Sequence, residues 1–214
     1  MVAQEIQGLI RSDESLESIV QESGKLSFLR ALLPELDRGG HRVAVFSKSK
    51  MMLTWIGLML REMGRSFIRI DGDVANIDQR QRLLDAFNAP HSPHFACLLT
   101  TRTGGVGINL TSADRVVIVD PDWNPAMDNQ AVDRSFRIGQ TRDVVVYRLI
   151  SCGSLEEVIY RKHIFKGGLF QQAVTKASSH ERKYQSYFTR AELVEALKLF
   201  SPETSDTHRQ VGRA

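Results

Sequence analysis

Short, almost continuous apolar runs alternate with longer amphipathic segments along the chain. The apolar runs lie at residues 43–46, 67–70, 95–99, 115–119 and 144–150. Strands that are apolar on both faces are typical of a parallel sheet buried between helices. Helical spacing of apolar residues predicts helices at 26–36, 51–63 and 77–87, after Asn124-Pro125, and from Ser154. The pattern therefore predicts an α/β fold, a doubly wound parallel sheet with helices on both faces.

Local signals refine the ends of these helices. Gly39-Gly40 should stop the first helix, and Pro34 inside it predicts a kink or an early end. Ser154-Leu-Glu-Glu157 is a good capping start for the last long helix, and Thr189-Arg-Ala-Glu192 is a capping box that opens a short helix over 189–200. We expect a linker or short helix at 1–22, a main α/β domain at 23–170 and a helical extension with a frayed tail at 171–214.

Composition narrows the class of protein only a little. The 214 residues are 42% hydrophobic and 25% charged, as in ordinary soluble domains, and the net charge of +3 permits nucleic-acid binding without establishing it. Cys97 and Cys152 have no second ligand at metal-site spacing and are expected to be buried or half-buried reduced thiols. No apolar run is long enough for a membrane span, and the acidic amino terminus is unlike a signal peptide. A cytosolic or nuclear protein is expected.

Polar segments follow four of the apolar runs. They are Ser47–Lys50, Asp71-Gly72, Thr100–Asn109 and Asp120–Asn124. Ligands of doubly wound folds bind at the carboxyl ends of the strands. We therefore expect these four segments to line one edge of the sheet.

The glycine-rich segment Thr100–Asn109 is a candidate for phosphate binding. Glycine lets a backbone bend and approach a ligand closely. Hydroxyl and guanidinium groups that suit phosphate oxygens come from Thr100, Thr101, Arg102 and Thr103. The alternative is an ordinary tight turn with polar side chains.

Arg134 and Arg137 form the second candidate. Residues three apart share one face of a helix, and two guanidiniums on one face could cradle a triphosphate. The alternative is that both arginines pair with surface carboxylates.

Two other sequence features have competing interpretations. Trp123, between turn residues at a strand end, is either a buried anchor or a platform on which a nucleic-acid base stacks. Ser23-Gly24-Lys25 looks like the end of a phosphate-binding P-loop, but Ile19 replaces the first glycine of that pattern and Leu26 follows the lysine. With no P-loop and no magnesium-binding carboxylate at a strand end, the chain cannot be a self-sufficient nucleoside triphosphatase.

Taken in order, five segments resemble the second RecA-like lobe of superfamily-two helicases, specifically the SWI/SNF-type DNA-dependent ATPases. The segments are Val43–Lys48, Arg69–Gly72, Leu99–Leu110, Asp120–Pro125 and Gln130–Gln140. The resemblance covers about Ser23 to Phe170. Tyr187–Leu193 is similar to the region after the motor in the excision-repair-like branch, which includes the Cockayne-syndrome group B protein and the Polo-kinase-interacting checkpoint helicase.

The resemblance implies a nuclear motor that couples ATP hydrolysis to movement on double-stranded DNA in repair or chromatin remodelling. ATP with Mg²⁺ would bind between two lobes, and the N-terminal RecA-like lobe of the same protein would supply the metal ligands. This chain would supply no metal ligand and would be inactive alone. Chromatin or repair proteins are further expected partners.

The resemblance also implies roles for individual residues. Arg137 would be the arginine finger, with Arg134 beside it and Gln130 holding the helix in register. The expected nucleotide contacts are Gly105, Gly107, Asn109 and Asp133. The expected DNA contacts are Ser47, Lys48, Thr100, Arg102, Thr103, Trp123 and Asn124.

Two alternatives to this function stay open. One is a superfamily-two motor that acts on RNA or on RNA polymerase, against which the pairing of Trp123-Asn-Pro125 with Arg137-Ile-Gly-Gln140 argues. The other is a degenerate lobe kept as a DNA- or protein-binding platform. Loss of ATPase activity despite an intact first lobe would favour that platform.

Overall fold

The computed structural model of the chain describes residues 15–74, 76–101 and 107–174. The chain divides into two compact units, residues 1–149 and 150–214. The helix expected over 189–200 and the sheet-edge residues Arg102, Thr103 and Gly105 lie outside the described part of the chain.

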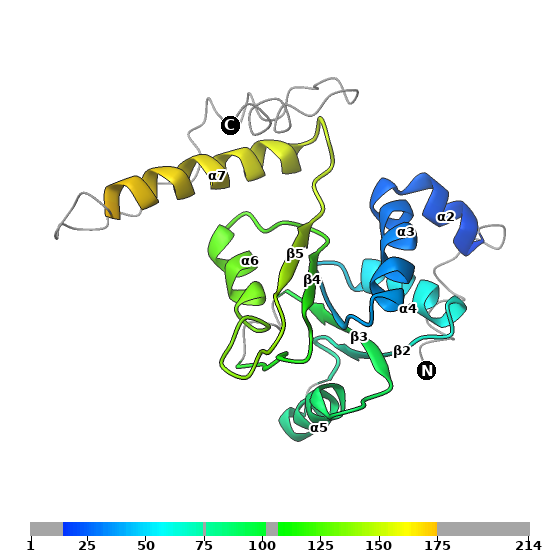
Figure 1. Cartoon of the computed structure of the whole chain (residues 1–214). Helices are drawn as coiled ribbons and strands as arrows, with labels where there is room; N and C mark the ends of the chain where they lie inside the picture. The colour runs from blue at the N-terminus through cyan, green and yellow to red at the C-terminus, as the bar shows by residue number, and fades with distance from the viewer. Residues whose placement is uncertain (1–14, 75, 102–106, 175–214) are drawn as a thin grey trace. The chain divides into compact units, whose positions relative to one another are not determined.

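The first unit is built on a five-stranded parallel sheet (Figure 1). The strands are β1 (Val43–Ser47), β2 (Ser66–Ile70), β3 (His94–Thr100), β4 (Arg115–Ile118) and β5 (Val145–Arg148). Their order across the sheet is β2-β3-β1-β4-β5, so the first strand in sequence lies at the centre. Val43 of β1 pairs with Ala96 on one side and with Arg115 on the other. The predicted parallel sheet is confirmed.

Helices cover both faces of this sheet (Figure 1). They are α2 (Leu16–Glu22), α3 (Gly24–Arg38) and α4 (Lys50–Glu62) on one face, and α5 (Ile77–Asn88) and α6 (Pro125–Val132) on the other. Alternate residues of β1 point to opposite faces of the sheet. Val43 and Val45 pack in the core beneath α2, α3 and α4, and Ala44 and Phe46 pack in the core beneath α5 and α6. Every residue of β1 is buried, which explains its uninterrupted apolar sequence.

Helix α3 does not end early at Pro34. It runs on to Arg38, and Gly39 and Gly40 follow it, the latter with a φ of 65°. Proline removes one helical hydrogen bond, but four leucines of α3, before and after Pro34 in the sequence, are buried in the core. Their packing keeps the helix continuous, while the predicted stop at Gly39-Gly40 is confirmed.

A buried carboxylate joins the amino ends of three strands. Asp114, only 1% exposed, lies just before β4. It accepts hydrogen bonds from the backbone N–H of Arg42 at 3.1 Å and from Nδ1 of His41 at 2.8 Å, and it forms an ion pair with Nε of Arg142 at 3.0 Å. His41 and Arg42 precede β1, and Arg142 precedes β5. This Asp114 cluster therefore fixes the edge of the sheet opposite to the loops Ser47–Lys50 and Asp120–Asn124.

The second unit begins with α7 (Leu155–Val174). The hydroxyl of Ser154 accepts the N–H of Glu156 at 3.2 Å, and the Glu157 carboxylate accepts the N–H of Gly153 at 2.8 Å. The predicted capping start is confirmed. No described helix combines the length and apolar character needed to cross a membrane.

Both cysteines are free thiols, but their surroundings differ. Cys97 is buried in β3, and this burial raises the pKa of its thiol. Cys152 is exposed, so the expectation that it is at least half-buried was wrong. Cys152 lies in a turn before α7, where the apolar strand pattern has already ended.

Candidate functional site

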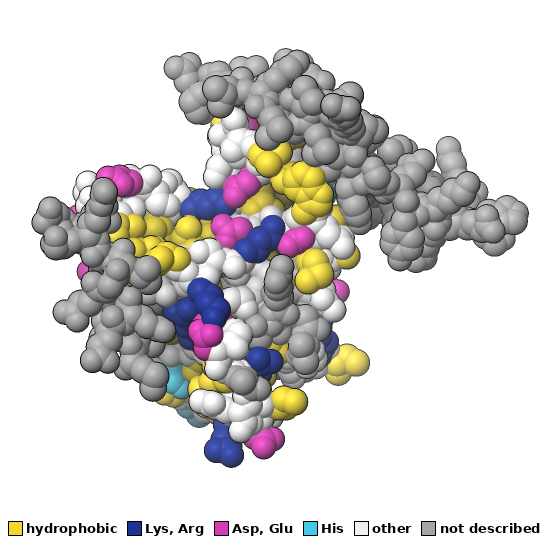
Figure 2. Space-filling view, turned by 180° about the vertical axis from the view of Figure 1, so that it is seen from behind, with side chains coloured by type: hydrophobic (Ala, Val, Ile, Leu, Met, Phe, Trp, Pro, Cys, Tyr) yellow, Lys and Arg dark blue, Asp and Glu magenta, His cyan; other side chains and the backbone are white. Residues whose placement is uncertain are grey.

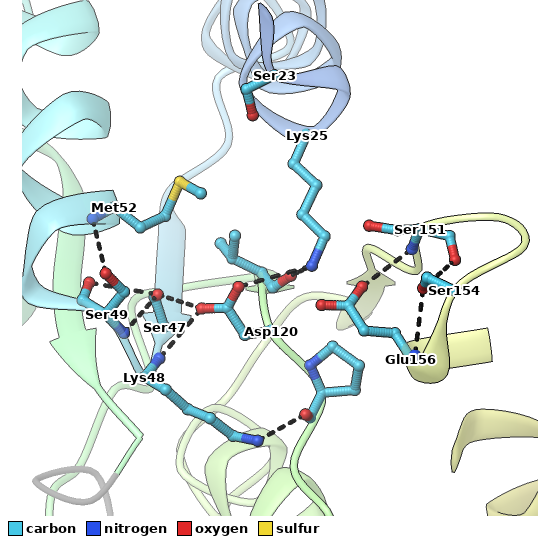
Figure 3. A network of polar contacts seen from close by, with 12 residues as sticks. Ser23, Lys25, Ser47, Lys48, Ser49, Met52, Asp120, Ser151, Ser154 and Glu156 are labelled. Atoms are coloured by element: carbon cyan, nitrogen blue, oxygen red, sulfur yellow. Dashed lines mark hydrogen bonds and ion pairs between the residues drawn. The ribbon is translucent and has the colours of Figure 1, made fainter. Parts of the chain in front are cut away.

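The carboxyl ends of β1, β3 and β4 meet at one edge of the sheet, as predicted. Ser47 pairs with Thr100 in the ladder, and its carbonyl accepts the N–H of Thr101 at 3.1 Å. On the other side, Ser47 donates its hydroxyl proton to the Asp120 carboxylate that follows β4 (Figure 3). Three polar segments that are far apart in sequence are thereby joined at one place.

Ser47 is fully buried, and its hydroxyl is used within the fold. Besides donating to Asp120, it accepts the N–H of Ser49 at 3.0 Å, and the Ser49 hydroxyl in turn caps α4 through the N–H of Met52 at 3.2 Å (Figure 3). A phosphate contact by the Ser47 side chain stays a prediction, and it would require exchange of the bond to Asp120.

Asp120 binds groups from three elements (Figure 3). Its Oδ2 accepts the Ser47 hydroxyl and the backbone N–H of Lys48, the latter at 3.2 Å. Its Oδ1 lies 3.6 Å from Nζ of Lys25, in the first turn of α3. Lys25 also donates to the carbonyl of Val119 at 2.7 Å. Asp120 begins a segment that was predicted to line this edge, but its pairing with Lys25 was not predicted, because neither residue has a sequence signal that reveals the other, 95 positions away.

Lys48 links the loop after β1 to the loop after β4. Its Nζ donates to the carbonyl of Pro121 at 2.7 Å and lies 3.4 Å from the Asp122 carboxylate. The side chain is nevertheless partly exposed. It can therefore meet an anion at the surface, in competition with Asp122.

The loop Asp120–Asn124 is held by further hydrogen bonds. The buried Asp128 of α6 accepts the N–H of Asp122 through both carboxylate oxygens, at 3.0 and 3.1 Å. The side chain of Asn124 caps α6 by accepting the N–H of Ala126 at 3.1 Å. Trp123 is 38% exposed, so it is not a fully buried anchor. The loop presents this indole from a fixed backbone.

Of the glycine-rich segment, the structure describes Thr100, Thr101 and residues 107–109. Thr100 and Thr101 are buried, and no described group bonds to the hydroxyl of Thr101. Gly107 has a φ of 51°, a conformation that favours glycine. Asn109 is exposed, and its carbonyl accepts a hydrogen bond from the Asn88 side chain at 2.8 Å.

The two candidate arginines do not share a helical face, which corrects the expectation of a helix through Arg137. Helix α6 ends at Val132, and turns follow up to Gln140. In a helix the carbonyl of Arg134 would accept the N–H of Ile138, but here it accepts the N–H of Leu110 at 2.9 Å. This bond to the segment before β4 replaces the helical one.

Arg134 and Arg137 also differ in exposure. Arg134 is 6% exposed, whereas Arg137 is exposed and donates from Nε to the carbonyl of Asp133 at 3.2 Å. Burial and, to a smaller extent, the positive charge of Arg137 lower the pKa of Arg134, while the charge of Asp133 raises it. Asp133 is exposed at the end of α6, and Gln130 is exposed on the same helix.

A cavity of about 760 Å³ adjoins Arg137 and is lined by residues of the segment 136–144. Phe136 and Ile138 flank the arginine there and are largely exposed. Gln140 supports this segment, because its side chain donates to the carbonyl of Ala113 at 2.9 Å and accepts the N–H of Arg142 at 3.0 Å. Gln140 belongs to the Gln130–Gln140 block, but its supporting role was not predicted.

Cations and carboxylates alternate on the face shown in Figure 2, and no continuous basic stripe covers the described residues there. Ion pairs near the candidate edge, such as Arg69–Asp71 at 2.7 Å and Lys50–Asp73 at 2.5 Å, follow the same pattern. Among the described residues no group of three or more His, Cys, Asp or Glu side chains is placed to hold a metal ion.

Residues 24–139, which contain the edge loops and both arginines, match the family described as helicase conserved C-terminal domain. The chain belongs to this family. The resemblance to the second RecA-like lobe of SWI/SNF-type ATPases, in the excision-repair-like branch, is thereby confirmed together with the relatives described next.

The helicase C-terminal lobe has relatives in animals and plants. It is 42% identical over 214 residues to a DNA excision repair protein ERCC-6-like of Danio rerio, covering 95% of this chain and 14% of that protein. It is 47% identical over 178 residues to the protein CHROMATIN REMODELING 24 of Arabidopsis thaliana, covering 83% of this chain and 16% of that protein. The chain thus spans less than a fifth of these relatives.

A solved structure has the same fold. The crystal structure of the C-terminal part of the Fun30 ATPase domain superimposes with a TM-score of 0.63 at 34% sequence identity, covering 71% of this chain and 47% of that one. The RecA-like α/β fold class is confirmed by this match together with the parallel sheet.

Proposed function

We propose that this chain is the C-terminal motor lobe of a protein that couples ATP hydrolysis to movement along double-stranded DNA. The names of the relatives, an excision repair protein and a chromatin remodelling protein, favour duplex DNA as the track. They also favour repair or chromatin proteins as partners and the nucleus as the compartment. The N-terminal lobe of the same protein would complete the ATP site and hold Mg²⁺.

The arrangement of Arg134 and Arg137 carries the proposal. The positive charges of Arg134 and Arg137 repel each other, and this repulsion adds to the effect of burial on the pKa of Arg134. The γ-phosphate of ATP is an anion that two guanidiniums can bind through several hydrogen bonds. Arg137 is exposed and oriented by Asp133, so it is the arginine able to reach a nucleotide held by another lobe.

The second part of the proposal concerns DNA. Lys48, Trp123 and Asn124 lie on two loops that are bonded to each other at the carboxyl edge of the sheet. Lys48 would bind a backbone phosphate, and Trp123 would pack against the strand. Contacts of this kind carry no sequence information, which suits a motor that steps over any sequence. Thr100, Arg102 and Thr103 remain predicted DNA contacts.

Movement would follow from the way ATP is shared between the lobes. Arg137 acquires its anionic partner only when the lobes close on ATP, and it loses that partner when the γ-phosphate leaves after hydrolysis. A positioned arginine stabilises the charge that develops on the transferred phosphoryl group and is worth about 10³–10⁵-fold in rate. Each cycle would therefore close and open the lobes while the edge loops hold DNA.

The test is ATP turnover by the full-length protein, with and without duplex DNA. Arg137→Ala should abolish DNA-stimulated turnover, by roughly 10³-fold or more, while DNA binding persists. Arg82→Ala is the matched control, because Arg82 is an exposed arginine of α5 with no predicted role in binding. Its turnover should equal that of the wild type.

Other outcomes would identify the alternatives. DNA-stimulated turnover that survives in Arg137→Ala would remove the finger assignment but keep the motor. Wild-type protein that binds DNA without hydrolysing ATP would favour the binding platform. Stimulation by RNA or RNA polymerase in place of duplex DNA would favour a different motor of the same superfamily.

A further inference from the structure

Lys25 occupies a position in the sheet that a backbone N–H normally fills. Val119 donates to the carbonyl of Phe46 at 2.9 Å, the last regular bond between β4 and β1. In a parallel ladder the carbonyl of Val119 would next accept the N–H of Lys48. That N–H bonds to the carboxylate of Asp120 instead, and Nζ of Lys25 donates to the Val119 carbonyl at 2.7 Å.

The same ammonium group offsets the charge of Asp120. Nζ of Lys25 lies 3.6 Å from Oδ1, while Oδ2 holds the Ser47 hydroxyl and the Lys48 N–H (Figure 3). The Lys25 side chain is only 14% exposed, so most of it is enclosed by the protein. An ion pair shielded from water in this way is stronger than one at the surface.

Through Asp120, the start of α3 is connected to both loops that carry candidate DNA contacts. Asp120 begins the loop that ends in Trp123 and Asn124, and it also fixes the backbone of Lys48. The Lys48 side chain in turn donates to the carbonyl of Pro121, in the loop Asp120–Asn124. The loops are thus held in one relative position by a carboxylate that Lys25 neutralises.

We propose that Lys25 is a positioning residue for DNA engagement: acting through Asp120, it fixes the relative position of the loops that bear Lys48 and Trp123. Lys25 is too enclosed to be a phosphate contact itself. Without its charge, Asp120 would repel approaching phosphates, and the Val119 carbonyl would lose its donor. The inference rests on the proposed DNA-dependent motor.

The experiment compares Lys25→Met, Asp120→Asn and the double variant in the full-length protein. The quantities are ATP turnover at saturating DNA, the DNA concentration at half-saturation, and amide hydrogen exchange of residues 120–124 without DNA. Lys25→Met should raise the half-saturating DNA concentration by roughly tenfold, the effect of one lost charged hydrogen bond, with turnover at saturating DNA unchanged. Exchange in the loop should become faster.

Arg65→Met is the matched control. Arg65 pairs with Asp37 at 2.6 Å, so its loss removes an ion pair from the other end of α3. A residue that merely stabilises α3 would behave like Arg65, lowering the unfolding temperature without changing the DNA concentration at half-saturation. The control should also leave exchange in residues 120–124 unchanged.

The double variant tests whether Lys25 acts through Asp120. In the Asp120→Asn background, Lys25→Met should change the DNA concentration at half-saturation by less than about twofold, because the effects of substitutions at two coupled residues do not add. The inference would be overturned if the effects of the two substitutions added fully, or if Lys25→Met left the DNA concentration at half-saturation unchanged. Wild-type protein whose turnover ignores DNA would contradict the proposed function instead; unchanged loop exchange in Lys25→Met would then separately overturn the positioning role.

Discussion

Arg134 and Arg137 lie three positions apart, yet they stand in different environments. Arg134 is enclosed, and its carbonyl bonds to Leu110, whereas the guanidinium of Arg137 is exposed beside a cavity. Removing a buried charged side chain disturbs the interior of the fold, whereas removing an exposed one changes stability little. Loss of activity on substitution of Arg134 can therefore reflect a damaged fold, whereas loss of activity on substitution of Arg137 reports on the site.

Arg134→Ala should lower the free energy of unfolding by about 1–3 kcal/mol, because it removes the packing of a side chain that is only 6% exposed. Arg137→Ala should change it by less than about 0.5 kcal/mol. Denaturant unfolding of both variants, compared with the wild type, measures the difference. Equal destabilisation by the two variants would contradict the assigned environments.

Residue types could be predicted from the sequence better than their surroundings. The glycine-rich segment and Trp123 mark the carboxyl edge of the sheet because few other residue types suit those turns. Burial of Ser47 could not be predicted, because its partner Asp120 is 73 positions away. A short polar residue after an apolar strand is equally suited to an exposed loop and to an internal hydrogen bond.

At the scale of elements, α4 packs very closely on the sheet at Gly57. A Cβ built at this glycine would lie 2.9 Å from the ring of Phe67 in β2 and 3.6 Å from Leu98 in β3. Real Cβ atoms almost never approach other atoms within 3.0 Å, so a side chain at this position would displace the ring. Glycine is therefore needed here for the contact between helix and sheet.

Gly57→Ala should destabilise the protein by about 1 kcal/mol. Alanine favours a helix interior by about 1 kcal/mol over glycine, but overpacking costs about 1–3 kcal/mol. Gly24→Ala is the control: Gly24 opens α3 with no atom within 4 Å of the added Cβ, and the substitution should stabilise by about 0.4–1 kcal/mol. Thermal unfolding of both variants shows whether each substitution raises or lowers stability. Stabilisation by Gly57→Ala would contradict the tight contact.

Element types followed from the sequence where local pattern and tertiary packing agree. Each predicted strand overlaps an observed one, because apolar residues on both faces suit a buried parallel strand. The prediction failed after Val132, where turns replace a helix. Helical spacing of the arginines carried no information about the bond between the Arg134 carbonyl and Leu110.

At the scale of the whole molecule, the mild positive charge is dispersed. Cations alternate with carboxylates on the face in Figure 2, so the described residues of that face offer DNA no continuous basic surface. The strength of binding would then come from a small number of placed contacts. The dependence of binding on salt reports how many there are.

Lys48→Met in the full-length protein should weaken duplex binding at low salt and reduce the slope of log affinity against log salt by about one. The loss should be the same for DNA of any sequence, since a phosphate contact is not sequence-specific. Arg82→Met should leave the slope unchanged. An unaltered slope in Lys48→Met would mean that its ammonium stays with Pro121 and Asp122 when DNA binds.

The Asp114 cluster gives the sheet the mechanics of a cantilever. Asp114 holds the amino ends of β1, β4 and β5 through two hydrogen bonds and an ion pair, and the other ends of β1 and β4 carry the loops with Lys48 and Trp123. In a beam held at one end, displacement grows with distance from the support. Small flexing of the strands would thus displace Lys48 and Trp123 more than the residues beside Asp114.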